Sequence, residues 1–316
     1  QTGDTGPARL PEEARTVLER HLNPEQDPSL AIRSLYGRWV PWILQFDRAW
    51  GTNAVSRIFL ETEPRYWLVA WDGFISFNNP YDDIFEPMQP VYAKAISQLG
   101  CPASEADDTR QLRDERLACH LMTFYWRGHY ALEDESGLFQ RFFAQAPDKI
   151  RAEAIEFVGR SLERTADPVD PIVLDRIQRL WTLRFEQAGQ DPTIHQAELM
   201  AFGWCFGSNK FEARWAIENL LGVLRLTHSI DPDFQVLEGL PDYISGFPME
   251  VLECVRLLIE GQTSHIDLSS WEGDLRRIFM QTREHLMPEV RHAGNEVIEL
   301  LGRRGYVNYG DLRSPD

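Results

Sequence analysis

Apolar residues recur along much of this chain at the i, i+3, i+4, i+7 spacing that places them on one side of an α-helix. Four such stripes lie in the second half, at residues 150–162, 173–181, 251–259 and 290–301. Strands would need alternating β-branched residues. The one short candidate of that kind is at residues 306–309. The spacing therefore predicts an all-α fold.

Several dipeptides and glycines mark where these helices are expected to begin and end. Asp before Pro supplies an N-cap acceptor followed by a residue suited to the first helical turn, and this pair begins at Asp167, Asp170, Asp191 and Asp231. Glycine is favoured just after the last turn. The candidate ends are Gly189, Gly222 or Gly239, Gly261, and Gly302 or Gly305.

The expected architecture is an irregular α-solenoid of antiparallel helix pairs, similar to a HEAT array. Helices of about 12 to 18 residues with short turns fill residues 148–305, as in stacked helix pairs, while no strict sequence period appears. The acidic segment 101–108 suits an exposed connection. We therefore expect a partly ordered lead-in at 1–30, an aromatic-rich helical subdomain at 31–100 and a helical-repeat subdomain at 101–316.

Charge and cysteine content restrict the partners. A formal charge of −17 opposes binding to phosphate backbones, so a nucleic-acid partner is not expected. No apolar run approaches the roughly 20 residues that cross a bilayer, so no membrane partner is expected either. Four cysteines without a CxxC pair indicate a reducing, cytoplasmic compartment. Because the chain begins at Gln1 without a signal-peptide pattern, we expect it to be a fragment of a larger protein.

The sequence offers no recognisable catalytic motif, and we expect no catalytic residue, metal or cofactor in this chain. It contains no GxSxG, GxxxxGK[ST] or GxGxxG pattern. Cys205 lies among aromatic residues, where a thiol is usually an inert core residue. Two functions other than a binding module remain open for this chain. One is a stand-alone helical adaptor, and the other is a helical enzyme with a buried metal or carboxylate site.

Such an enzyme site would be built from a few histidines and aspartates: Asp72, Asp82, His120, His129 or His195. His195 and Glu198 share one helical face, which resembles half of a carboxylate-bridged metal site. Sites of that type need a second copy of the pair and further carboxylates, and the sequence contains no second copy. Caps and ordinary surface pairs are therefore the favoured interpretation of these residues.

Aromatic residues are dense in the first 100 residues. One cluster runs through Trp67, Trp71, Phe74, Phe77, Tyr81 and Phe85, and its spacing fits one helical face only in part. Core packing is the first interpretation. A partner surface is the second, because Trp and Tyr are favoured interface anchors. On that second interpretation the candidate binding residues are Trp67, Trp71, Phe74, Tyr81 and Tyr92.

Three stretches resemble the carboxy-terminal helical regions of large bacterial antiviral-defence proteins. They are the Trp-rich block 67–75 with Asn79-Pro80, Phe85 and Tyr92, the segment 201–211, and the closing helix with its terminus at 289–306. Proteins of that kind carry a sirtuin-type or other effector domain at the amino terminus, and often a STAND-type NTPase core. Their helical tails recognise a trigger or support assembly.

The resemblance implies that any effector or NTPase chemistry lies upstream of this chain, and it supplies no catalytic residue. We accordingly expect a protein-binding and scaffolding module of a multidomain anti-phage defence protein. Its partner would be a protein trigger or a neighbouring subunit, and homo-oligomers would assemble through the full-length protein.

Overall fold

The computed structural model describes residues 9–101, 109–133, 137–262 and 271–314. All regular secondary structure in these ranges is helical, which confirms the all-α part of the prediction. The strand candidate at residues 306–309 forms no strand, and residues 308 and 309 lie in a turn. The chain divides into two compact units, Gln1–Pro147 and Asp148–Asp316. Among the described residues, no helix combines the length and hydrophobicity needed to cross a membrane.

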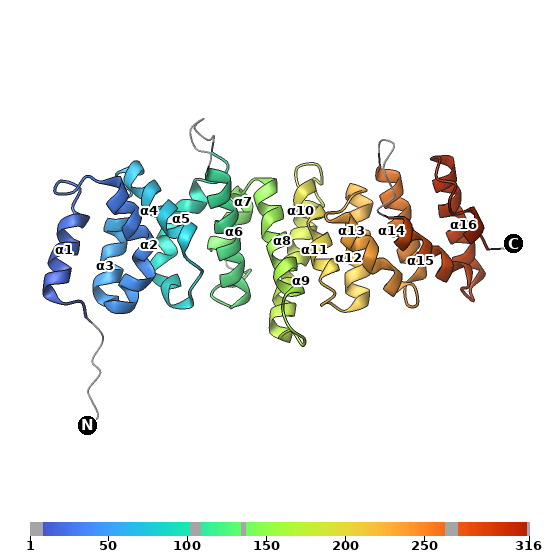
Figure 1. Ribbon diagram of the computed structural model, residues 1–316, viewed down its shortest axis with the longest axis horizontal. Helices are drawn as coiled ribbons and strands as arrows, with labels where there is room; N and C mark the ends of the chain where they lie inside the picture. The colour runs from blue at the N-terminus through green and yellow to red at the C-terminus, as the bar shows by residue number, and fades with distance from the viewer. Residues whose placement is uncertain (1–8, 102–108, 134–136, 263–270, 315–316) are drawn as a thin grey trace, which may run out of the picture. The chain divides into compact units, whose positions relative to one another are not determined.

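The first unit consists of helices joined by short loops (Figure 1). Its α-helices, with one 3-10 turn η1, are α1 (Glu12–Leu22), α2 (Leu30–Phe46), α3 (Arg48–Ile58), α4 (Pro64–Phe77), η1 (Asp82–Ile84), α5 (Phe85–Ser97), α6 (Arg110–Trp126) and α7 (Leu138–Gln145). The side chain of Ser29 caps α2 by accepting the Ile32 N–H, and Asp47 caps α3 by accepting the Trp50 N–H. These caps satisfy backbone donors that the first helical turn leaves unpaired.

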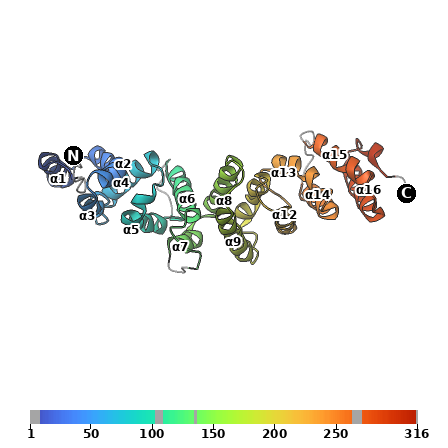
Figure 2. The ribbon, with the colours of Figure 1, turned by 90° about the horizontal axis from the view of Figure 1, so that it is seen from below.

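Helices α2 and α4 form the closest pair of this unit and lie side by side in both views (Figures 1 and 2). Two glycines permit the approach. A Cβ at Gly37 would lie 1.9 Å from the Ala70 carbonyl oxygen, and one at Gly73 would lie 2.2 Å from the Ser34 carbonyl oxygen. No other residue type fits at these two positions without moving a backbone.

The core of the first unit is an aromatic stack that begins on α4. Trp67 stacks on Trp71 with ring centroids 5.8 Å apart, and Phe74 and Tyr92 continue the cluster through edge-to-face contacts. All four side chains are buried. Because α4 and α5 both contribute rings, and Phe124 of α6 packs on Tyr92, this cluster joins three helices into one core.

The second unit contains the amphipathic helices that the periodicity predicts. Its elements are α8 (Asp148–Glu163), α9 (Pro171–Ala188), α10 (Gln196–Met200), α11 (Phe202–Gly207), α12 (Ala213–Thr227), α13 (Asp233–Gly239), η2 (Leu240–Tyr243), α14 (Pro248–Gly261), α15 (Glu272–Arg283), α16 (Pro288–Arg303) and η4 (Gly310–Leu312). Helix α8 packs on α10 and α11, while α14 packs between α12 and α16. The predicted stripe at residues 251–259 is buried in α14.

The predicted helix ends are partly right. Asp170 caps α9 by accepting the Ile172 N–H, and Gly189 follows its last residue. Asp191, in contrast, accepts the Thr193 N–H in a turn, and no helix begins at Asp167. Gly222 lies inside α12, whose end is His228 in a left-handed conformation. Short polar side chains favour turns as readily as helix caps, which explains the misplaced starts.

The division between compact units differs from the expected one. It falls at residues 147 and 148 rather than near residue 100, because α6 and α7 pack on α4 and α5. Residues 12–22, within the expected lead-in, form the regular helix α1. The expected acidic connection lies, from residue 102 to 108, outside the described residues.

Candidate functional site

An apolar groove of about 380 Å³ lies between α1 and α2 in the first unit. The lining is mostly apolar, and its polar side-chain groups are the His21 imidazole, the Tyr36 hydroxyl and the two tryptophan indole N–H groups. The lining residues are Leu10, Leu18, His21, Ile32, Leu35, Tyr36, Trp39, Trp42, Ile43 and Phe46. A concave surface of this size and polarity is typical of a binding site.

One wall of the groove is a row of large side chains on α2 that remain half exposed. The exposed fractions are 48% for Leu35, 49% for both Trp39 and Trp42, and 53% for Phe46. The ring centroids of Trp39 and Trp42 are 6.3 Å apart, and those of Trp42 and Phe46 are 6.1 Å apart. Their spacing of four, three and four residues places all four on one side of the helix, so they form a continuous apolar row.

Helix α2 carries a second apolar stripe beside this row, and Tyr36 and Ile43 of that stripe also line the groove. Tyr36, Val40, Ile43 and Leu44 are buried against the rest of the unit. A helix that is apolar around most of its circumference is usually enclosed on all sides. Helix α2 is enclosed on its inner side only, which leaves the row from Leu35 to Phe46 without protein neighbours over half of its surface.

The other wall, α1, is attached to the unit largely by polar contacts. Arg15 donates to the Asp47 carboxylate at 2.8 Å, and Glu19 accepts from Trp50 Nε1 at 2.5 Å and from Arg57 Nη2 at 2.8 Å. The Arg57 hydrogen bond outweighs burial and lowers the pKa of Glu19 to about 2. These ionic contacts fix α1 at the edge of the groove and leave its apolar Leu18 facing α2.

The structure places most of the aromatic binding candidates in the core. Trp67, Trp71, Phe74 and Tyr92 are buried, so they have almost no surface to offer a partner. Tyr81 is 46% exposed in the loop before η1. Their burial favours the core-packing interpretation for the four buried residues, and partner contact stays a prediction for Tyr81.

The candidate metal ligands of the first unit each have other partners. His120 is buried, with Nδ1 2.8 Å from the Tyr92 hydroxyl and Nε2 3.0 Å from the Asn78 carbonyl oxygen. A carbonyl only accepts, so Nε2–H donates to it and Nδ1 accepts the Tyr92 proton. Burial lowers the pKa of His120 to about 4. His129 Nε2 lies 2.9 Å from Asp82 Oδ1, so these two candidate ligands pair with each other.

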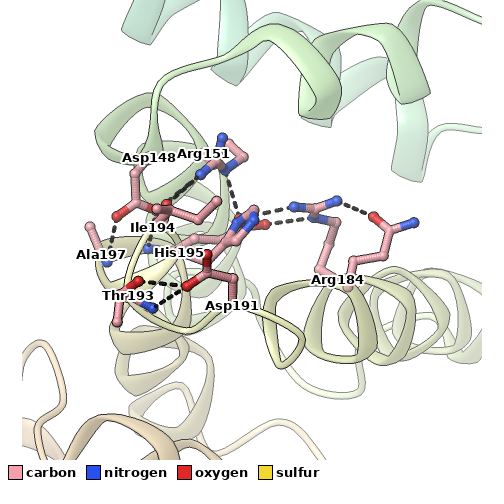
Figure 3. A network of polar contacts seen from close by, with 10 residues as sticks. Asp148, Arg151, Arg184, Asp191, Thr193, Ile194, His195 and Ala197 are labelled. Carbon is pink, nitrogen blue, oxygen red and sulfur yellow. Dashed lines mark hydrogen bonds and ion pairs between the residues drawn. The ribbon is translucent and has the colours of Figure 1, made fainter.

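A buried ionic cluster in the second unit includes the predicted His195–Glu198 pair (Figure 3). The Glu198 carboxylate accepts two hydrogen bonds from Arg184, at 2.6 and 2.9 Å, and one from Arg151 Nε at 2.7 Å. His195 Nδ1 lies 3.0 Å from the same carboxylate. Burial opposes ionisation, but the hydrogen bonds and charges of the two arginines outweigh it and lower the pKa of Glu198.

Asp148 completes this cluster by joining two helices. Its carboxylate accepts the N–H groups of Ala197 and Glu198 at 2.8 and 3.1 Å, so a residue of α8 caps the short helix α10. Arg151 also donates to the Ile194 carbonyl at 3.0 Å. Three helices, α8, α9 and α10, are therefore tied together through Glu198 and its partners.

Asp148, His195 and Glu198 are the one trio within the described ranges whose carboxylate and imidazole atoms are close enough to share a metal ion. Their surroundings do not suit a cation. Two guanidinium groups already occupy the Glu198 oxygens, and both oxygens of Asp148 accept backbone N–H groups. A divalent cation would have to displace these donors beside two fixed positive charges. The cluster is consequently a structural ion-pair network.

Comparisons with known proteins returned no matching family model, no matching curated protein and no matching solved structure. Function must therefore be inferred from the geometry of the groove and from the chemistry of its lining.

Sequence reasoning missed the row formed by Leu35, Trp39, Trp42 and Phe46. The signal that marks it is the excess of apolar residues in one segment, because residues 30–46 carry two apolar stripes where a half-buried helix needs one. The aromatic residues Trp67, Trp71 and Phe74 of α4, which are more conspicuous in the sequence, belong to the core instead.

Proposed function

We propose that this chain is a protein-binding and scaffolding module that recognises a protein trigger or a neighbouring subunit through the α1–α2 groove. The observation that carries this proposal is the row of four half-exposed large apolar side chains along one wall of the groove. Together their exposed surface is on the order of 400 Å², the size of the largest apolar patch on a typical monomer, and such patches commonly serve in binding.

The chemistry of the groove favours a protein ligand. Trp and Phe rings give large contact areas with few rotatable bonds, and two of the four groove-wall residues are tryptophans. An amphipathic helix docks into such a groove with apolar residues at i, i+3 or i+4, and i+7. Few polar groups could orient a small metabolite, namely His21, Tyr36 and the two indole N–H groups. His21 Nδ1 lies 2.6 Å from the Asp27 carboxylate, and the Tyr36 hydroxyl donates to the Leu18 carbonyl at 2.7 Å.

The wider setting belongs to the same proposal. The packing of α14 against both α12 and α16 supports an irregular α-solenoid of HEAT-like pairs in the second unit. No disulfide joins the four cysteines, which supports a cytoplasmic setting. The role in a multidomain bacterial anti-phage defence protein is supported by the resemblance at residues 67–75, 201–211 and 289–306.

A photo-crosslinking experiment tests the groove as the binding face. A photoreactive phenylalanine analogue is placed at Phe46, and in a matched control at Ile172 of α9, which is 63% exposed in the second unit. Irradiation in cells should give a discrete protein adduct from position 46 and none from position 172. The adduct should disappear when Trp42→Asp is added to the position-46 chain.

Three results would contradict the proposal. Equal adducts from both positions would show non-specific contact, and adducts that survive Trp42→Asp would place the partner elsewhere. An adduct with phospholipid in place of protein would make the row a membrane-contact surface.

A further inference from the structure

We infer that the α1–α2 groove binds a second copy of this chain, with the two α2 helices packed antiparallel across a two-fold axis. This inference rests on the proposed function of the groove as a protein-binding site and names its partner. It follows from the charge distribution of α2, from the order of its exposed side chains and from the area that they offer.

The charge distribution permits self-association at this face. The whole chain has a formal charge of −17, so two copies repel each other over most of their surfaces. Residues 9–48 are different, since their charges cancel. This segment contains six acidic residues and six arginines, namely Glu12, Glu13, Glu19, Glu25, Asp27, Asp47, Arg9, Arg15, Arg20, Arg33, Arg38 and Arg48.

Helix α2 itself brings almost no charge to the interface. It contains no acidic residue, and its two arginines are engaged within the unit. Arg33 is buried and donates to the carbonyls of Arg57 and Leu22, while the Arg38 guanidinium lies 4.4 Å from the Phe77 ring centroid. The centres of protein interfaces are poor in charge and rich in Trp and Phe, which is the composition of this face.

The order of the exposed residues is self-complementary. An antiparallel pair centred between Trp39 and Trp42 places Leu35 opposite the partner's Phe46 and Trp39 opposite the partner's Trp42. Both contacts then occur twice, as a two-fold interface requires. The row on each α2 has the spacing of apolar residues with which a helix docks into a groove. The other side of each groove, formed by α1, then contacts the partner's α2 through residues such as Leu18.

The available area sets the expected strength. The exposed row offers on the order of 400 Å² per copy, and the flanking wall of α1, including the 54% exposed Val17, adds to it. Specific interfaces bury roughly 600 Å² or more per partner. The row alone is smaller than that, so the contact is weak even with the α1 wall added. We expect reversible dimerisation in the micromolar range rather than an obligate dimer.

Sedimentation velocity over a concentration series tests the dimer with the complete chain. The wild-type mass should rise from 36.6 kDa toward twice that value. Phe46→Glu should weaken dimerisation roughly 30-fold or more, since it places a charge in a desolvated contact. Ile172→Glu, a matched exposed position, should leave it unchanged. Both positions are on the surface, so we expect each variant to fold. Circular dichroism checks this.

A compensating pair tests the antiparallel arrangement. Leu35→Lys and Phe46→Glu should each give a monomer, whereas the double variant should dimerise again, because each new lysine then faces the partner's new glutamate. That recovered dimer should weaken as salt increases. A double variant that stays monomeric overturns the antiparallel docking.

Two other outcomes also overturn the inference. In the first, the wild-type chain is monomeric at all concentrations while the position-46 photoprobe captures a different protein, so the proposed function survives without a second copy as the partner. In the second, the wild-type chain dimerises and Phe46→Glu does not change it, so another face forms the dimer. Failure of the proposed function itself is distinct, because the position-46 photoprobe would then give no protein adduct that depends on Trp42.

Discussion

Two regions of the molecule contrast in polarity, the α1–α2 groove of the first unit and the Glu198 cluster of the second. The first unit leaves Leu35, Trp39, Trp42 and Phe46 half exposed and buries a neutral histidine, His120. The second unit buries an ionised carboxylate, Glu198, between two arginines. An exposed apolar row does little for the stability of the free chain and is available to a partner. A buried ion pair tolerates no loss of a member, so it specifies how its helices pack.

The largest effect is expected inside the second unit. Glu198→Ala should lower the free energy of unfolding by about 3–5 kcal/mol, because it leaves two buried guanidinium groups without their carboxylate. Urea unfolding followed by circular dichroism measures the loss. Glu218→Gln on α12, whose ion pair with Arg214 is exposed, should change stability by less than about 0.5 kcal/mol. Equal losses in both variants would remove the contrast between buried and exposed charge.

The first unit allows two tryptophans to be compared. Trp67→Ala in the core should lower the free energy of unfolding by about 3–5 kcal/mol. Trp42→Ala on the exposed row should lower it by less than about 1 kcal/mol. Thermal unfolding at a concentration where the chain is monomeric measures both. If Trp42→Ala destabilised the monomer as much as Trp67→Ala, the row would be part of the core and unsuited to a partner.

A smaller effect is expected from the buried histidine, whose contribution to the free energy of unfolding depends on pH. Unfolded histidine binds a proton near pH 6.5, whereas burial lowers the pKa of His120 to about 4. The neutral form is favoured in the fold, so stability is complete above pH 6.5 and falls as the pH decreases toward 4. The loss attributable to this group should be roughly 3 kcal/mol.

Replacement by glutamine provides the measurement. In His120→Gln the amide can still donate to Asn78 and accept from Tyr92, but it does not titrate, so the dependence of stability on pH between 6.5 and 4 should flatten. His292→Gln at an exposed site on α16 should keep the wild-type slope. An unchanged slope in His120→Gln would mean that His120 does not control the acid sensitivity of this unit.

Periodicity predicted much of the fold because helical stripes are local. The stripe at 251–259 became the buried side of α14, and Asp170 became the N-cap of α9. The boundary between units depends on which helices pack together, which local sequence does not encode, and so residues 101–147 joined the first unit. Composition also could not separate a tryptophan in the core, such as Trp67, from one on the surface, such as Trp42.

The candidate site shows the same limit. His195 and Glu198 are in contact, but His195 is the N-cap residue of α10 rather than part of its face. The partners that define their role, Arg151 and Arg184, come from other helices. Pairing across distant segments decides whether a His–Glu pair binds a metal or holds helices together. The groove was missed for the opposite reason, since its row is local but an apolar residue in a helix is normally assigned to the core.

The close contact between α2 and α4 determines how the exposed row is presented. With Gly37 against the Ala70 carbonyl and Gly73 against the Ser34 carbonyl, α2 cannot rotate about its own axis without a steric clash. The rings of Trp39, Trp42 and Phe46 are therefore held outward before any encounter. A partner meets a preorganised surface and loses little conformational entropy in ordering it. Substituting either glycine would be expected to turn the row away from its partner while leaving every residue of the row intact.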